Sequence, residues 1–122
     1  MFLGDYLKTI IKWRSNKERK KESGRLWSIF TDDMNRCIIS GYSGIHIERH
    51  HVFGGANKKR SELYGFIAPL RYDLHPNGSA CYWSDEAKSI DLNLKRSCQW
   101  FYEESIGSRE EFIKEFGRSY LG

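Results

Sequence analysis

The sequence predicts a single domain of the α+β class. Its 122 residues match the usual length of one domain, and 39% hydrophobic with 15% aromatic residues is too rich for a disordered chain. Apolar residues recur at helical spacing near both ends of the chain, whereas the middle is rich in β-branched residues and glycine-bounded turns. The expected order is therefore helix, hairpin, strand, helix, helix.

The first helix is expected within residues 2–14. Leu3, Leu7 and Ile10 share one face at helical spacing, so this helix should be amphipathic. Residues 15–24 contain no apolar side chain and indicate a linker or a frayed helical end. We therefore divide the chain into a basic helical arm, 1–24, and a body, 25–122. The apolar face of the arm could dock on the body, on a partner or on a second copy of the chain.

Charge is unevenly distributed along the chain. Residues 1–25 hold eight Lys or Arg and three acidic residues, a net charge of +5, whereas the other residues together carry −1. A basic arm on a neutral body suits a polyanion such as nucleic acid, and it is equally compatible with a solvated helix that only aids solubility. No apolar run approaches the roughly 18 residues of a membrane span, so no membrane partner is expected.

The N-terminal sequence and the cysteines point to the cytoplasm. Asp5 interrupts the only apolar stretch near the start, so no secretory signal is expected. The three cysteines, Cys37, Cys81 and Cys98, are odd in number and form no CxxC pair. This pattern argues against both a disulfide framework and a four-thiolate zinc site.

The middle of the chain predicts the sheet. Residues 36–40 and 45–53, joined by a glycine-bounded turn, are typical of a β-hairpin. Residues 54–62 carry two glycines, an asparagine and three consecutive cations, and we expect a loop there. Residues 65–70 form a short apolar stretch that predicts a further strand, with Pro69 near its end.

Two helices are expected in the last third of the chain. The first begins at Ser84 or Asp85 as N-cap. Its apolar stripe comprises Ala87, Ile90, Leu94, Cys98 and Phe101. The second begins with a capping box formed by Ser108 and Glu111, and Gly117 ends it. Its expected inward-facing residues are Phe112, Ile113 and Phe116.

The histidine pair at the end of the predicted hairpin carries the strongest chemical signal. His50 and His51 are followed by the cations Lys58, Lys59 and Arg60, and then by His75 in a turn-rich segment. Phosphodiester hydrolysis needs a base for water, a cation facing the phosphate and donors for the remaining negative charge. Histidine suits the first role and binds metals, and the lysines and arginine suit the last.

The run CIISGYSGIHIERHHVFGGANKKRSELYGFIAPLRYDLHPNG resembles HNH-type nuclease-like proteins of phage and prophage genomes. The closing run GSREEFIKEFGRSYL resembles the C-terminal helix of the same group, so the resemblance covers residues 26–121. It implies the ββα-metal (His-Me finger) fold, in which a hairpin and a helix hold one metal ion. The C-terminal helices and the basic arm would be additions to this core.

The resemblance also implies roles for the three histidines. His50 matches a metal ligand, His51 matches the general base that activates water, and His75 matches a second metal ligand. Glu48 could accept a hydrogen bond from a metal-bound histidine, although a surface charge is the commoner role for such a residue.

Other positions depart from the family pattern. Asn57 is the nearest match to the asparagine that orients the loop, but its spacing to His75 is unusual. Asn77 and Cys81 are the nearest candidates for a further ligand. The paired CxxC motifs that hold structural zinc in many relatives are absent, so no structural zinc is expected. With two firm ligands, Mg²⁺ or Mn²⁺ completed by water and phosphate fits best.

These features predict a metal-dependent DNA endonuclease or nickase with little sequence preference, acting in the cytoplasm of a bacterial host. Lys58, Lys59 and Arg60 would hold the backbone, and DNA is favoured over RNA as the partner. The alternative is a catalytically inactive phage protein on the same fold that binds and blocks a host protein or nucleic acid.

Overall fold

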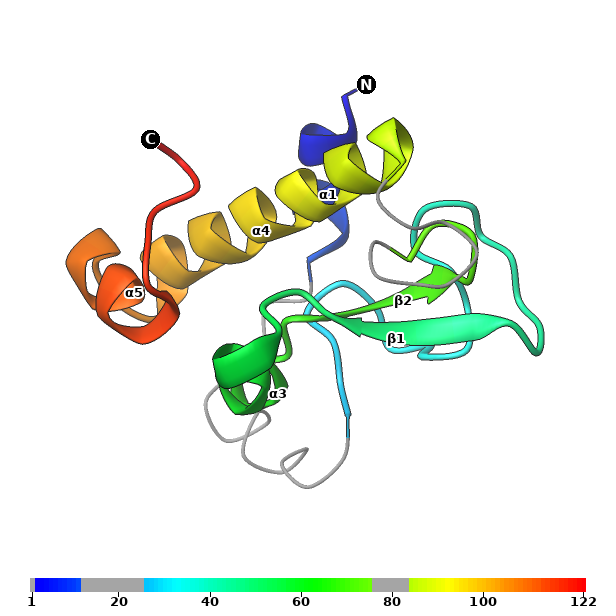
Figure 1. Cartoon of the computed structure of the whole chain (residues 1–122), viewed down its shortest axis with the longest axis horizontal. Coiled ribbons are helices and arrows are strands. Elements are labelled where there is room, and N and C mark those ends of the chain that lie inside the picture. Colours follow the sequence, from blue (N-terminus) through cyan, green and yellow to red (C-terminus); the bar gives the residue numbers. More distant parts are fainter. Residues whose placement is uncertain (1, 12–25, 76–83) are drawn as a thin grey trace.

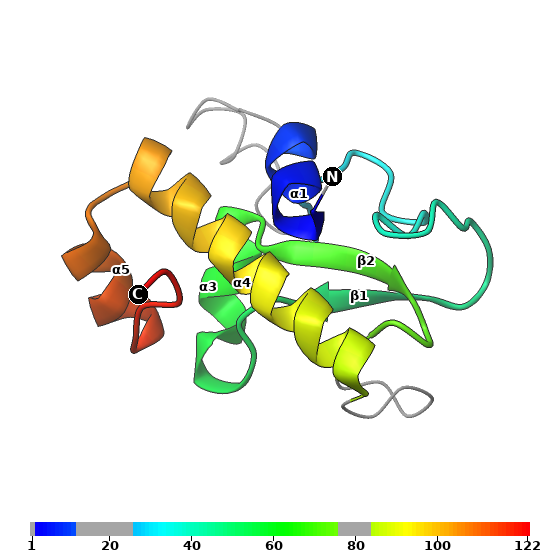
Figure 2. The same ribbon diagram turned by 90° about the horizontal axis from the view of Figure 1, so that it is seen from above.

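The computed structural model describes residues 2–11, 26–75 and 84–122. It shows an α+β fold with a two-stranded antiparallel sheet and, within those residues, four α-helices (Figure 1). The elements are α1 (Leu3–Ile10), β1 (Ile47–His51), the short 3₁₀ helix η1 (Gly55–Asn57), α3 (Lys58–Tyr64), β2 (Ile67–Arg71), α4 (Asp85–Ser105) and α5 (Arg109–Phe116). Helix α4 crosses one face of the sheet, and α3 lies on its other side (Figures 1 and 2).

The strand that pairs with β1 is β2. The register runs antiparallel from Ile47 opposite Arg71 to His51 opposite Ile67. The predicted strand at 65–70 is confirmed, but the expected pairing of 36–40 with 45–53 is wrong. Arg36 instead forms an isolated bridge with Ser43, inside the predicted turn, and β1 pairs with β2.

The segment after Arg36 folds into a tight turn instead of a strand. The Gly41 N–H donates to the Cys37 carbonyl at 2.9 Å, and Gly41 has a φ of 77° that few other residues adopt. The Ile38 N–H donates to the Pro69 carbonyl at 3.1 Å, so this segment lies along the outer edge of β2.

Pro69 stands at a position of the ladder where no amide proton is needed. The Val52 N–H donates to the Phe66 carbonyl, and the Tyr72 N–H donates to the His46 carbonyl, each at 2.9 Å. Hydrogen-bonded pairs recur at every second residue, so the pair of Arg49 and Pro69 falls between them. The missing donor of Pro69 therefore costs the sheet no hydrogen bond.

Residues 55–64 form η1 and α3, so the loop predicted for 54–62 is wrong. The sequence KKRSELY consists mainly of good helix formers. The two preceding glycines and the three consecutive cations had indicated a loop instead. Gly65 ends α3 in the left-handed region, with φ 74°, and its N–H donates to the Ser61 carbonyl. A Cβ atom at Gly65 would lie 2.7 Å from the Trp27 ring, so glycine is required there on two grounds.

The two C-terminal helices begin where the sequence predicts. Ser84 caps α4 by accepting from the Ala87 N–H, and the whole predicted apolar stripe is buried. Ser108 and Glu111 form the predicted capping box of α5. Ile113 corrects one expectation, because it is 37% exposed.

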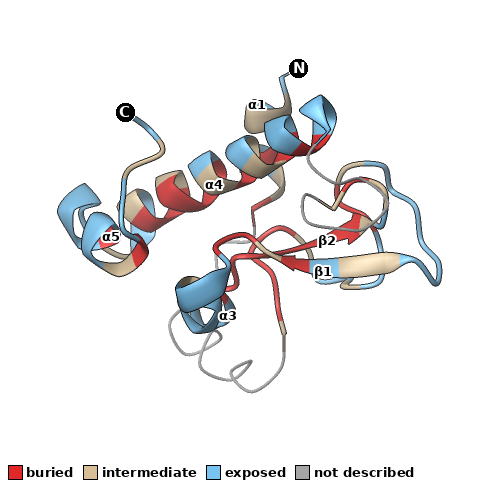
Figure 3. Ribbon diagram, in the orientation of Figure 1, coloured by how far each residue is buried: buried red, intermediate tan, exposed pale blue. Residues whose placement is uncertain are grey.

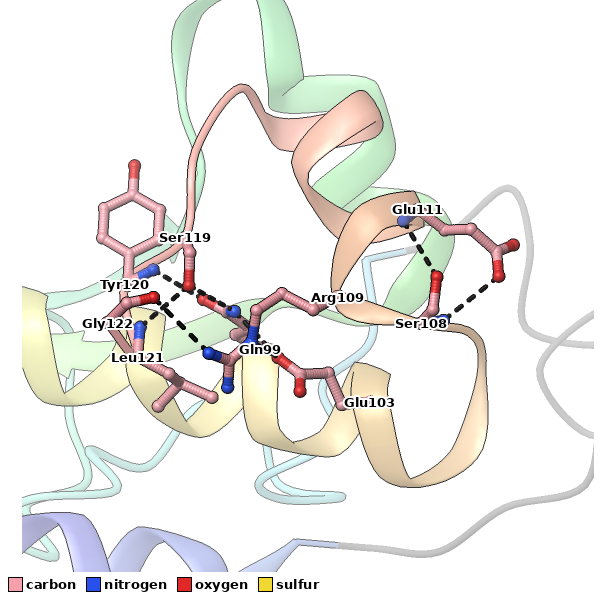
Figure 4. A network of polar contacts seen from close by, with 9 residues as sticks. All are labelled: Gln99, Glu103, Ser108, Arg109, Glu111, Ser119, Tyr120, Leu121 and Gly122. Atoms are coloured by element: carbon pink, nitrogen blue, oxygen red, sulfur yellow. Dashed lines mark hydrogen bonds and ion pairs between the residues drawn. The ribbon is translucent and has the colours of Figure 1, made fainter.

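Gln99, a buried polar residue of α4, holds the C-terminal segment in place (Figure 4). Its side-chain carbonyl accepts from the Tyr120 N–H at 2.7 Å, and its amide donates to Ser119 Oγ at 2.9 Å and to Glu103 Oε2 at 2.8 Å. These contacts hold the C-terminal segment against α4 at Gln99.

Helix α1 packs on the body. Its bounds confirm the predicted amphipathic helix, and Leu7 is fully buried where α1 contacts α4. Figure 3 shows buried residues along the inner face of α4. The Tyr6 hydroxyl donates to the Ile38 carbonyl at 3.0 Å. The apolar face that could have joined two copies is therefore used within the chain. Most of the predicted basic arm, residues 12–25, lies outside the described residues.

No helix in the described ranges combines the length and the apolar character that crossing a membrane requires.

Candidate functional site

Strand β1 sends its two adjacent histidines to opposite faces of the sheet. Successive side chains alternate along a strand, and the ladder continues past His51 to Val52. His50 is 4% exposed and lies beneath α4, whereas the His51 side chain is 16% exposed and meets α3. The structure therefore gives the two histidines separate partners.

His50 faces His75. His50 Nδ1 lies 3.0 Å from His75 Nε2, with the ring centroids 4.8 Å apart and the rings steeply inclined. His75 follows β2 directly, after a turn in which the Leu74 N–H donates to the Arg71 carbonyl at 2.8 Å. The structure thus brings together the two residues expected as metal ligands.

Each histidine of this pair has a carboxylate on its outer side. His75 Nδ1 lies 2.9 Å from Glu48 Oε2, and Glu48 shares its strand face with His50. His50 Nε2 lies 3.6 Å from Asp91 Oδ1 of α4, and the other Asp91 oxygen meets Lys95 Nζ at 2.5 Å. We call these four aligned side chains, Glu48, His75, His50 and Asp91, the histidine line.

Burial and charge favour the neutral form of His50. Burial lowers its pKa, and the facing His75 acts in the same direction, against an opposing contribution from Asp91. Burial by itself would raise the pKa of Asp91, but its interactions with His50 and Lys95 lower it below the ordinary value. A neutral imidazole beside an ionised carboxylate is the protonation state in which histidine binds metals.

The spacing of the pair fits a divalent ion. Two adjacent ligands of an octahedral ion, each at about 2.1 Å, lie about 3 Å apart, which matches the nitrogen–nitrogen distance of 3.0 Å. Across the described residues, no three His, Cys, Asp or Glu side chains form a group that could hold a metal. Within the described residues, His50 and His75 are therefore the two candidate protein ligands. Asn77 and Cys81, the further candidates, lie outside the described residues.

His51 forms a second, separate cluster. Its Nε2 lies 3.1 Å from Glu62 Oε2 in α3. The expected phosphate-binding residues Lys58, Lys59 and Arg60 are all exposed in the first turn of the same helix. The predicted base thus contacts the helix that carries the predicted phosphate contacts, on the side of the sheet away from α4.

Asn57, the expected loop-orienting residue, contacts α5 and Arg60. Its amide donates to the Phe116 carbonyl at 3.3 Å, and its side-chain oxygen accepts from Arg60 at 3.2 Å. Asn57 therefore fixes η1 to the C-terminal end of α5.

Sequence reasoning missed three residues of these clusters: Asp91, Lys95 and Glu62. Asp91 directly follows Ile90 of the buried stripe, so its carboxylate had to emerge at the edge of the sheet-facing side of α4. Its spacing of four residues to Lys95 was a signal for an ion pair on that helix. Glu62 gave no signal, because α3 itself was not predicted.

No family model, no curated protein and no solved structure matches this chain.

Proposed function

We propose that the chain is a metal-dependent nuclease of the ββα-metal type that hydrolyses DNA backbone phosphodiesters. The facing nitrogens of His50 and His75 carry this proposal, because their separation of 3.0 Å matches that of two adjacent ligands of an octahedral ion and burial lowers the pKa of His50. The order of β1, β2 and α4 supports it, with one histidine on the first strand and the other between the second strand and the helix.

Mg²⁺ or Mn²⁺ held by His50 Nδ1 and His75 Nε2 would act as a Lewis acid on the scissile phosphate. His51 is the proposed general base. With Nε2–H engaged by Glu62, its Nδ1 keeps the lone pair that accepts a proton. Lys58 and Lys59 offer their charge to neighbouring phosphates, which positions the backbone without reading its sequence.

This assignment requires that the metal ligand His50 and the proposed base His51 act on the same phosphate. His51 belongs to the face opposite the histidine line, so the proposal requires that a bound phosphate reaches both faces of the sheet near His51. The base is therefore the part of the proposal that a single variant tests most directly.

The separation of the clusters also favours a second candidate function. A catalytically inactive protein on the same fold, which binds nucleic acid or a host protein in the bacterial cytoplasm, needs no shared cleft for His50 and His51. Such a protein could bind the ion at the histidine line for structural reasons alone.

Plasmid nicking separates the two. The purified protein is incubated with Mg²⁺, with Mn²⁺ and with chelator, beside His51→Ala and the control His46→Ala, which removes an exposed histidine outside both clusters. Metal-dependent nicking that is lost in His51→Ala and kept in His46→Ala is the expected result. A folded protein that nicks with neither metal would overturn the nuclease proposal in favour of the binding protein.

A further inference from the structure

We propose that Glu48 and Asp91 are positioning residues that fix the tautomers of His75 and His50, so that both free nitrogen lone pairs face a single divalent ion. This inference rests on the metal site of the proposed function. It adds two carboxylates, from β1 and α4, to which neither the sequence nor the resemblance gave a definite role.

The order of groups along the histidine line carries the argument. Glu48 contacts His75 Nδ1 at 2.9 Å, His75 Nε2 faces His50 Nδ1 at 3.0 Å, and His50 Nε2 faces Asp91. An ionised carboxylate only accepts hydrogen bonds, so the nitrogen beside Glu48 carries a proton, and the nitrogen beside Asp91 would carry one once that carboxylate accepts from it. Protons at both outer positions would replace the hydrogen bond between the two imidazoles by two facing lone pairs.

Two lone pairs 3.0 Å apart repel each other unless both bind a positive ion, which at about 2.1 Å from each nitrogen would lie to one side of the line that joins them. A divalent ion bound to both nitrogens removes the repulsion and leaves each outer N–H directed at its carboxylate. Metal-binding histidines commonly donate their second N–H to a carboxylate in this way, which fixes the ring and raises its basicity. Here Glu48 already contacts His75 in this way, and Asp91 lies next to His50 at 3.6 Å.

Asp91 is held ready for this role. Its Oδ2 is occupied by Lys95 at 2.5 Å, which leaves Oδ1 directed at His50 Nε2. That nitrogen is buried and has no hydrogen-bond partner in the part of the chain that the structure describes. The distance of 3.6 Å exceeds a normal hydrogen bond by roughly 0.5 Å, so a small rotation of the carboxylate would satisfy it.

The two imidazole nitrogens favour a transition-metal ion. Imidazole nitrogens prefer ions such as Mn²⁺ and Zn²⁺, whereas Mg²⁺ prefers oxygen. We therefore expect the protein to bind Mn²⁺ more tightly than Mg²⁺.

The test measures metal binding without activity. Free Mn²⁺ is followed by electron paramagnetic resonance in titrations of the wild-type chain, Glu48→Gln and Asp91→Asn, with thermal melts to confirm folding. Glu62→Gln is the matched control, because it removes the carboxylate from His51 instead. Each line variant should weaken Mn²⁺ binding by about 10–100-fold, as loss of such partners typically does, and Glu62→Gln should leave it unchanged.

A second measurement reports the tautomers themselves. In the Zn²⁺-loaded protein, nitrogen chemical shifts should show coordination through Nδ1 of His50 and Nε2 of His75, with the outer nitrogens protonated. Glu48→Gln should disturb the His75 pattern and Asp91→Asn the His50 pattern. Coordination through the outer nitrogens would overturn the inference.

The outcomes separate this inference from the proposed function. Mn²⁺ binding that both line variants weaken, by a protein that never nicks DNA, would support the positioning roles and remove the nuclease. Nicking with Mn²⁺ affinity unchanged in both variants would overturn the inference and leave the nuclease standing. A folded wild-type chain that binds no Mn²⁺ would show that a shared proton fills the gap, and the inference would fall.

Discussion

The hydroxyl of Ser61 holds both backbone polar groups of Phe53. Ser61 Oγ donates to the Phe53 carbonyl at 2.7 Å and accepts from the Phe53 N–H at 3.0 Å, with both residues buried. This pair fastens α3 to the chain just beyond β1. His51 lies two residues before Phe53 and Glu62 directly follows Ser61, so the same contact brings the proposed base to its carboxylate.

Ser61→Ala is expected to destabilise the fold by about 1–3 kcal/mol, because it leaves a buried N–H and a buried carbonyl without their partner. Urea denaturation gives the free energy of unfolding. Ser89→Ala, at an exposed position of α4, should stay within about 0.5 kcal/mol of the wild type. Equal effects of the two variants would show that the Phe53 groups find water in place of Ser61.

Leu7→Ala is expected to cost about 2–5 kcal/mol of stability, because Leu7 is fully buried between α1 and α4. Phe2→Ala should change little, since Phe2 is 85% exposed. Light scattering should give the same mass for Leu7→Ala and the wild type. A loss of mass without a loss of stability would mean that α1 joins two copies of the chain.

The double variant Lys58→Gln/Lys59→Gln is expected to weaken DNA binding and its salt dependence. Each lost phosphate contact lowers the slope of log affinity against log salt by about 0.9 on duplex DNA. Fluorescence anisotropy across a salt series measures this slope. Lys88→Gln/Lys114→Gln removes the same charge from exposed positions on α4 and α5, and should leave the slope nearer that of the wild type. Two equal slopes would make the first turn of α3 unimportant for binding.

Alkaline pH is expected to destabilise the protein through Tyr102. Burial, followed by the 2.6 Å hydrogen bond to Glu115, raises the pKa of Tyr102 above its ordinary value of 10.0. Above pH 10.0 the unfolded chain releases this proton while the folded protein keeps it, so stability falls as pH rises. Denaturation at neutral and alkaline pH should show a smaller loss in Tyr102→Phe. Tyr42→Phe, at an exposed tyrosine, should lose as much as the wild type.

The helices could be predicted because their signals are local. Ser84 and the Ser108–Glu111 capping box define two starting points, and the spacing of the apolar residues defines which face is buried. Ile113 was misplaced because helical spacing fixes a face only to within about one residue, and its neighbours Phe112 and Phe116 fill the space.

The sheet could not be predicted as easily, because strand pairing depends on residues far apart in the sequence. Residues 36–40 carry strand-forming side chains, but Cys37 and Gly41 close a turn before any ladder forms. Residues 67–71 pair with β1 in place of residues 36–40, because this pairing buries both faces of β2 beneath the rest of the chain. Local propensity cannot show which of two neighbours wins.

The candidate site was predicted in part for the same reason. His50 and His75 were predicted as metal ligands from their residue types, and this stays a prediction, but the structure does bring the two side chains face to face. Asp91 and Glu62 entered only through the packing of α4 and α3 on opposite sides of β1. Which histidine faces which helix is a property of the sheet register, and a single sequence does not state it.

Pro69 acts as a mark of that register. A slip of one residue would set Pro69 opposite His50 or Glu48. Pro69 would then either occupy a hydrogen-bonded position without an N–H to donate, or one strand would have to present its opposite face. A strand turned over would exchange the surroundings of the two histidines. Pro69, which has no backbone N–H, therefore helps determine that the His50 imidazole contacts α4 and the His51 imidazole contacts α3.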